Sequence, residues 1–368
     1  MTATSSFEAT QRLPEDQARS FPCEGCGADL EFNIKVQKLK CEFCGFEKEI
    51  DLSEEATIEE QDLNAMLAKQ ANTKTSGDSS TDSEYNCTEC GGTVLFQNNV
   101  ISTECPYCGS PIQREEVHES SNRIPTDAVL PFMVPHEDAK QNLKKWVESR
   151  WFAPGDFKQR GVQGKFNGLY MPHWTFDALT FNEYRGERGE TYTVKDSEGN
   201  SKTKTRWYPA NGRFQRFFDD VLVCAVRDAK RKLMEKLEPW HLDKAVPFNQ
   251  ESLAGYQAMT YEVELQDGFN IGRDKMDEAI RREVKKRIGG DRQRIHSVNS
   301  RYDGLTFKNL MLPVWMLAYR YNDKSYQVVV NASTGEVQGE RPWSWVKIFF
   351  TALLGVSIAV GLSMLDKQ

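Results

Sequence analysis

Histidine is scarce in this 368-residue chain, and the five that occur are scattered from His118 to His296. They lack the spacing of a zinc protease, and no Gly-x-Ser-x-Gly element accompanies them. The Gly-Lys pair in Gly161–Phe166 lacks the first-glycine spacing and the following Ser or Thr of a phosphate-binding loop. We therefore expect a protein that is not an enzyme and contains no helicase motor. His173, beside Trp174, is expected to be a packed or exposed side chain.

An apolar run is missing from residues 1–20, which are largely threonine, serine, glutamine and charged residues. This composition argues against a secretory signal peptide and predicts a disordered N-terminus. Only 39% of the chain is hydrophobic, and the mean hydropathy is -0.62. A chain of this length can still form two or three domains with one sizeable core.

One long uncharged run is present, the eighteen residues Ile348–Leu365. At about 1.5 Å per residue it covers roughly 27 Å, which predicts a single membrane span within an anchor at 343–368. A buried core helix is the alternative. Trp343 and Trp345 lie where an interfacial aromatic belt is expected, and Arg341 and Lys347 precede the run. The positive-inside rule then predicts a tail-anchored protein of the cytoplasmic (inner) membrane, with its N-terminal bulk in the cytoplasm.

Small residues recur every four positions in this run, at Thr351, Gly355, Ala359 and Ser363. Such a face lets two helices approach closely in lipid, so a homodimer through the anchor is one interpretation. The other is that small residues are simply common in membrane helices.

Cysteine is concentrated in one repeated pattern of C-x2-C pairs separated by fourteen residues, and the second copy lies 64 residues after the first. Two such pairs supply the four tetrahedral thiolates that structural zinc prefers, and a glycine follows the second cysteine of every pair. Disulfides or redox-active pairs are the alternatives, but redox motifs do not occur as four pairs in two equal frames. We predict zinc ribbons at 21–50 and 85–116, each holding one structural Zn²⁺. The ligands are Cys23, Cys26, Cys41, Cys44, Cys87, Cys90, Cys105 and Cys108.

The segment 51–84 that joins the ribbons is expected to contain a short, solvated acidic helix, with Leu63, Met66 and Leu67 at helical spacing. The Ser-, Thr-, Asp- and Gly-rich residues 71–83 predict a flexible tether. The two ribbons therefore need not hold a fixed orientation.

The remaining chain predicts an α+β body with halves at 128–245 and 246–342. Each half has a Pro-Phe pair, a helix, a Pro-x-Trp element and alternating strands, which indicates an internal duplication. The expected helices are His136–Phe152, Arg227–Leu237 and Arg273–Ile288. The strands are expected at Thr175–Tyr184, Thr191–Lys195, Lys202–Pro209, Trp315–Tyr321 and Tyr326–Asn331, and Cys224 is expected in the core.

Charge is divided unevenly along the chain. Residues 1–127 carry 24 acidic and 10 basic side chains, a net charge of -14, which leaves +7 for residues 128–368. Seven basic residues lie within Arg281–Arg294. This stretch is a solvated helix face, a surface for anionic lipid or a surface for nucleic acid. The ribbon at 21–50, with six carboxylates and four lysines, suits a protein partner better than phosphate.

Several motifs resemble those of bacterial membrane-associated zinc-ribbon proteins along nearly the whole chain. They are Cys105-Pro-Tyr-Cys-Gly109, Glu238-Pro-Trp240, Ile288-Gly-Gly-Asp291, Leu312-Pro-Val-Trp315, Val330-Asn-Ala-Ser-Thr-Gly-Glu-Val337 and Arg341-Pro-Trp-Ser344. Members are often labelled primosomal protein N-prime (replication factor Y), superfamily II helicase or transcription-factor-IIB-type zinc-ribbon protein. Some relatives are grouped with membrane-stress proteins that recruit coat-like partners.

Together these patterns predict a cytoplasmic adaptor that recruits protein partners to the inner membrane through its zinc ribbons. The alternative is a membrane-tethered nucleic-acid-binding factor associated with DNA replication, because the family labels imply work on DNA.

Overall fold

The computed structural model describes residues 21–28, 30–50, 58–73, 83–86, 93–96, 117–119, 124–155, 157, 166–195, 197, 199–321 and 324–365. The predicted disordered segment 1–20 lies outside these ranges, as do the four cysteines of the second set, at positions 87, 90, 105 and 108.

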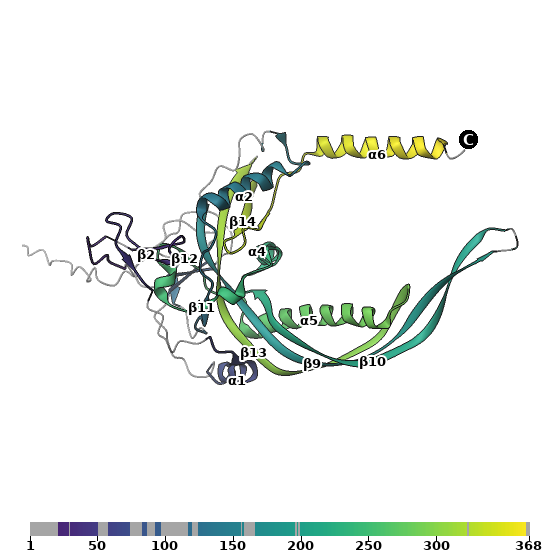
Figure 1. Cartoon of the computed structure of the whole chain (residues 1–368), viewed down its shortest axis with the longest axis horizontal. Coiled ribbons are helices and arrows are strands. Elements are labelled where there is room, and N and C mark those ends of the chain that lie inside the picture. Colours follow the sequence, from purple (N-terminus) through teal and green to yellow (C-terminus); the bar gives the residue numbers. More distant parts are fainter. Residues whose placement is uncertain are drawn as a thin grey trace, which may run out of the picture.

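The body is built on a mainly antiparallel sheet, which confirms the predicted α+β class. Its main path runs β10-β9-β13-β14-β15, and short strands pair with this path or with one another. The three longest strands lie side by side and curl together into a half-barrel (Figure 1). The main strands are β9 (Phe166–Lys195), β10 (Ser201–Cys224), β13 (Arg292–Tyr321), β14 (Lys324–Asn331) and β15 (Val337–Gly339). The short strands are β4 (Gln61–Asp62), β8 (Ala128–Val129), β11 (Val246–Pro247) and β12 (Gln257–Ala258).

Helix α5 (Leu265–Ile288) lies along the concave side of the curled strands (Figure 1). Its buried face includes Met276, Ile280 and Val284, which belong to one apolar cluster with aromatic side chains of β9 and β10. The predicted helix had the correct C-terminal end but began eight residues too late. Its first turns are anchored by close packing, because a Cβ added at Gly268 would come within 2.6 Å of the Trp174 ring.

The other described helices are α1 (Leu63–Thr73), α2 (His136–Glu148), α4 (Asp228–Met234) and α6 (Trp345–Leu365). The predicted helix from His136 is confirmed, although it ends four residues earlier than expected. The expected helix Arg227–Leu237 is also confirmed, since α4 continues as a 3-10 turn at Glu235–Leu237.

Helix α1 is not the solvated helix that the sequence predicted. Leu63 is fully buried, and Met66 and Leu67 pack against the same apolar cluster as α5. The preceding strand β4 pairs with β13 at Thr306 and Phe307. The acidic segment is therefore tied to the body, because its few apolar side chains complete the core.

The two halves of the body contact each other in a crosswise manner. Trp174, in the first half, donates from its indole nitrogen to the carbonyl of Val263, two residues before α5. Trp315, in the second half, donates in the same way to Val134, two residues before α2. Each half also has a short strand, a helix and a pair of antiparallel strands in the same order: β8, α2, β9 and β10 in the first half, and β11, α5, β13 and β14 in the second. The duplication itself stays a prediction. A duplicated body would place each tryptophan against the segment before the helix of the other half, as these two hydrogen bonds do.

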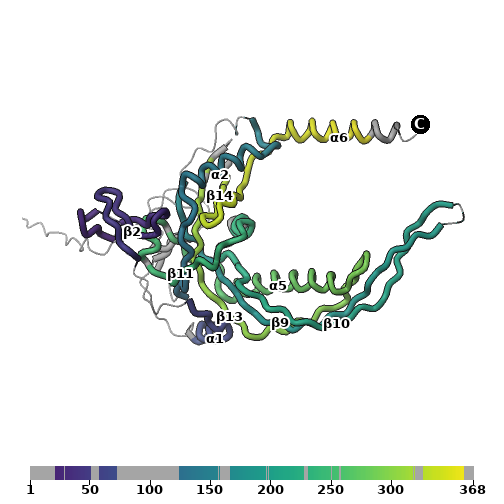
Figure 2. Tube along the Cα trace, viewed as in Figure 1, coloured from purple at the N-terminus to yellow at the C-terminus, as the bar shows by residue number. Residues whose placement is uncertain are grey.

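Helix α6 extends away from the body, as Figure 2 shows. Within the described residues, no helix combines the length and apolar character needed to cross a membrane. The predicted span at Ile348–Leu365 is therefore not supported.

Candidate metal centre

The first cysteine set lies on a small three-stranded sheet formed by β1 (Glu31–Asn33), β2 (Lys38–Lys40) and β3 (Glu47–Lys48). One cysteine pair lies in the loop before β1, and the other lies in the turn between β2 and β3. The hairpin arrangement brings the two turns together, so that residues fifteen and twenty-one positions apart become neighbours.

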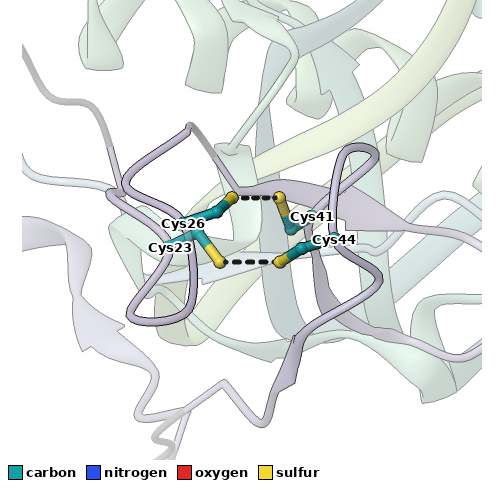
Figure 3. A group of neighbouring side chains, drawn as sticks. All are labelled: Cys23, Cys26, Cys41 and Cys44. Atoms are coloured by element: carbon teal, nitrogen blue, oxygen red, sulfur yellow. Dashed lines mark hydrogen bonds between the residues drawn. The ribbon is translucent and has the colours of Figure 1, made fainter.

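Figure 3 shows the four cysteine side chains pointing toward one another. All four sulfur atoms lie within 4.8 Å of one another. The Sγ atoms of Cys23 and Cys44 are 3.4 Å apart, and those of Cys26 and Cys41 are 3.5 Å apart. A tetrahedral zinc ion with sulfur at about 2.3 Å requires neighbouring sulfurs roughly 3.8 Å apart. The cluster thus has the dimensions of a site for a single ion such as zinc.

Two glycines shape the turns that carry these cysteines. Gly27 and Gly45 have φ angles of 76° and 78°, and their N–H groups donate to the carbonyls of Cys23 and Cys41. A residue with a Cβ is strained in this left-handed region. This backbone conformation explains why glycine follows the second cysteine of each pair in this ribbon.

The thiols have unequal acidity without a metal ion. The backbone N–H of Cys44 lowers the pKa of Cys41 to about 7, and the N–H of Phe43 acts in the same direction. The pKa of Cys44 is instead about 12, because hydrogen bonds with the thiols of Cys23 and Cys26 outweigh the N–H of Phe46. Four thiolates so close together need a cation. A bound ion would supply that charge and favour deprotonation of all four.

All four ligand positions of such an ion come from the protein. An ion held in this way has no open position for water or substrate, so it would stabilise the fold rather than act on a substrate. Cys23 and Cys41 are buried, whereas Cys26 and Cys44 are exposed at the outer side of the ribbon.

The ribbon is packed onto the body, although the tether predicted from the sequence would have allowed it to move independently. Leu39 and Phe32 belong to the same buried cluster as Phe132 of the body. The Gln37 side-chain amide donates to the Phe132 carbonyl at 2.9 Å, and Lys48 lies 3.1 Å from Glu251. The ribbon therefore shares a core with the body, which its cysteine spacing could not reveal.

Outside the ribbon, His173 and Cys224 are buried side chains. Burial lowers the pKa of His173 to about 4, and its Nδ1 lies 3.0 Å from the carbonyl of Met171. Burial raises the pKa of the Cys224 thiol to about 12. Both groups are thus neutral at physiological pH, and Cys224 is the core residue that the sequence predicted.

The sequence did not predict a partly buried charged cluster around Lys308. The ammonium of Lys308 lies 2.8 Å from Asp220, 3.3 Å from Glu60 and 3.9 Å from Asp177. The backbone N–H of Asp220, a residue with φ of 50°, donates to Asp177. A carboxylate between the buried residues Phe176 and Ala178 is the signal that could have revealed the cluster.

The cluster lies where the long strands bend. The pairing of β9 with β10 shifts register between Phe218 and Val221, and that of β9 with β13 shifts between Asp303 and Thr306. Extra residues at such bulges increase local twist and bend. Glu60 directly precedes β4 and α1. Its ion pair with Lys308 therefore joins this segment to the point where the half-barrel curves.

The chain is 25% identical over 343 residues to the uncharacterized protein YdjG of Bacillus subtilis (strain 168). The match covers 91% of this chain and 94% of that protein. No protein-family model matches the sequence, and no solved structure does. The chain is thus a distant homologue of YdjG along nearly its whole length.

Proposed function

We propose that this chain is a cytoplasmic adaptor that holds protein partners at the inner membrane surface. The observation that carries the proposal is α6, a helix whose apolar side chains face solvent. Leu354 is 62% exposed and Ile358 is 55% exposed, and aromatic side chains precede them on the same helix. Contiguous apolar surface of this kind marks a site for a partner or a membrane.

A lipid surface suits this helix better than water. Each Å² of apolar area removed from water contributes about 25 cal/mol, and α6 offers at least six large apolar side chains. They are Val346, Phe349, Phe350, Leu353, Leu354 and Val356. In this proposal α6 inserts its apolar side chains into the bilayer, and the body remains on the cytoplasmic side.

The partner-binding part of the proposal is assigned to two zinc ribbons, each with one structural ion. In the described ribbon, Phe43 lies between the ligands Cys41 and Cys44 and is 84% exposed. An exposed aromatic side chain on a rigid turn is typical of a contact residue in a protein interface. The matching position in the second set is Tyr107, 64 residues later.

A pull-down from detergent extract tests the partner side of this proposal. The full chain is compared with a Phe43→Ala variant and with a Phe217→Ala control, which changes another exposed phenylalanine on β10. We expect one specific protein to be retained by the full chain and the control, and to be reduced at least tenfold with Phe43→Ala. Equal recovery from all three would remove Phe43 from the proposal.

The resemblance to membrane-associated zinc-ribbon proteins supports the same proposal, and it also implies the alternative of nucleic-acid binding. One observation favours that alternative. Arg281, Lys285 and Lys286 are exposed on α5, and Arg292 follows them on β13. Lysine and arginine on one surface are the electrostatic signature of phosphate binding.

Charge reversal separates these two functions. Replacing Arg281, Arg282, Lys285 and Lys286 with Glu should weaken binding to anionic vesicles, while binding to DNA remains negligible before and after the change. DNA affinity at physiological salt that is lost on reversal would instead establish the nucleic-acid function.

A further inference from the structure

Three exposed tryptophans gather at the point where α6 leaves the body. Trp151 follows α2 and is 71% exposed, and Trp343 and Trp345 precede or begin α6 with exposed fractions of 52% and 78%. Tryptophan is a large, partly apolar side chain that is usually covered, so three exposed ones at one place call for a physical reason.

Backbone contacts hold the two segments together. The N–H of Ser344 donates to the Phe152 carbonyl at 2.8 Å. The ammonium of Lys347 donates to the carbonyls of Trp151 and Ala153, at 3.3 Å and 2.8 Å. Residues nearly two hundred positions apart in the sequence are thereby fixed as one surface, which we call the tryptophan patch (Trp151, Trp343 and Trp345).

Two arginines lie near this patch. The guanidinium of Arg341 lies 4.3 Å from the ring centroid of Trp343. Arg150 directly precedes Trp151, and its guanidinium lies 4.6 Å from the ring centroid of the buried Trp146, outside the patch. Burial and the positive charge of Arg150 lower the pKa of Arg341, as expected for two nearby guanidinium groups. With Lys347, three positive charges are therefore placed around the tryptophans.

We propose that the tryptophan patch and its cations form a docking surface for the headgroup region of an anionic lipid bilayer. Indole rings favour the boundary between headgroups and hydrocarbon, where one edge is wet and the face is apolar. Arginine and lysine beside them attract anionic headgroups. Helix α6 leaves the body beside α2, and its apolar side chains are exposed, so one bilayer can contact both the patch and α6.

Trp151 extends the contact beyond the C-terminal segment. It comes from the loop after α2, and α2 packs on the body through Leu143, Trp146 and Val147. A bilayer touching both Trp151 and α6 would fix the orientation of the body, rather than hold it by one flexible end. This inference rests on the proposed membrane function and adds the residues that set the orientation.

Vesicle flotation with the full chain tests the inference, using phosphatidylcholine vesicles and vesicles that also contain phosphatidylglycerol. Trp151→Ala should lower affinity for the anionic vesicles about fivefold, the effect of losing part of one buried indole. Arg150→Gln with Arg341→Gln should lower affinity for anionic vesicles but not for neutral ones. The control Phe217→Ala, which removes an exposed ring on β10, should bind like the unchanged chain.

The outcomes test separately whether the tryptophan patch contacts lipid and whether the chain binds membranes at all. Binding that is unchanged by Trp151→Ala and by the double arginine variant would overturn the docking surface and leave the membrane function intact. Failure of the unchanged chain to bind either kind of vesicle would overturn both, and would favour an apolar protein partner for α6. Equal thermal unfolding midpoints for all variants show that each is folded.

Discussion

At the level of single residues, the surroundings of Asp177 strongly shift the pKa of its carboxyl group. Burial raises its pKa to about 7, and hydrogen bonding to Glu60 acts in the same direction. The pKa of Glu60 is lowered instead, with the hydrogen bond from Asp177 as the largest cause. Asp177 therefore holds the proton that this pair shares, while the nearby Lys308 remains charged.

Stability should fall as pH rises through this range. A carboxyl whose pKa is higher in the folded state than in the unfolded state favours folding at low pH, and that contribution is lost between about pH 4 and pH 7. Asp177→Asn keeps an acceptor for Asp220 and a donor for Glu60, so it imitates the protonated form. The thermal unfolding midpoint of the variant should change less between pH 5 and pH 7.5 than that of the unchanged chain. If the midpoints of both chains change equally with pH, Asp177 does not titrate in this pH range.

Cys41 provides a second prediction at this scale. Cys41→Ser removes one ligand from a closed site whose strands share a core with the body, so it should abolish stoichiometric zinc binding by this ribbon. The free energy of unfolding of the body should fall by about 2–4 kcal/mol, because Leu39 and Phe32 lose their fixed position. Metal analysis and denaturant titration measure the two effects. A body of unchanged stability would mean that the ribbon core contributes little.

At the level of elements, the close approach of α5 to β9 depends on two glycines, which have no side chain. Added Cβ atoms at Gly268 and Gly272 would lie 2.6 Å from Trp174 and 2.8 Å from Phe176. Both rings are fully buried and cannot move easily. The two glycines thus let the helix approach β9 closely, at a cost in helix propensity that packing offsets.

Gly268→Ala should therefore lower the free energy of unfolding by about 1–3 kcal/mol, although alanine favours helices. Gly355→Ala in α6 is the matched control, because nothing lies within 4 Å of its added Cβ. That variant should be unchanged or slightly more stable. Denaturant unfolding of both compares them directly, and equal effects would show that α5 can shift at little cost.

The elements also show what the sequence could and could not predict. The start of α2 and the end of α5 followed from helical spacing, and the clustering of the first four cysteines followed from their spacing. The long strands were predicted too short: Thr175–Tyr184 and Thr191–Lys195 are parts of the single strand β9, and residues 292–314 of β13 were not predicted as strand. Pro172 and Pro313 were interpreted as strand starts. In the structure both prolines lie inside strands, and their carbonyls accept from Ala225 and Ala332. The docking of the ribbon depends on long-range packing, which local pattern does not contain.

At the level of the whole molecule, the chain joins three parts: a cysteine-containing ribbon, a half-barrel body and the projecting helix α6. The ribbon carries an exposed Phe43 and four clustered cysteines that could hold one metal ion, a half-barrel encloses α5, and α6 projects with apolar side chains in solvent. The tryptophan patch lies where α6 meets the body. This arrangement supports an adaptor whose partner-binding and membrane-binding parts are held by one body.

Removal of residues 343–368 tests this account most directly, with membrane flotation of the full and the shortened chain at low and at high salt. The account predicts that the full chain floats with membranes at both salt concentrations and that the shortened chain does not float at high salt. Flotation of the shortened chain at low salt alone would reflect screened contacts of basic residues, which remain compatible with the account. A shortened chain that floats as well as the full chain at high salt would contradict it.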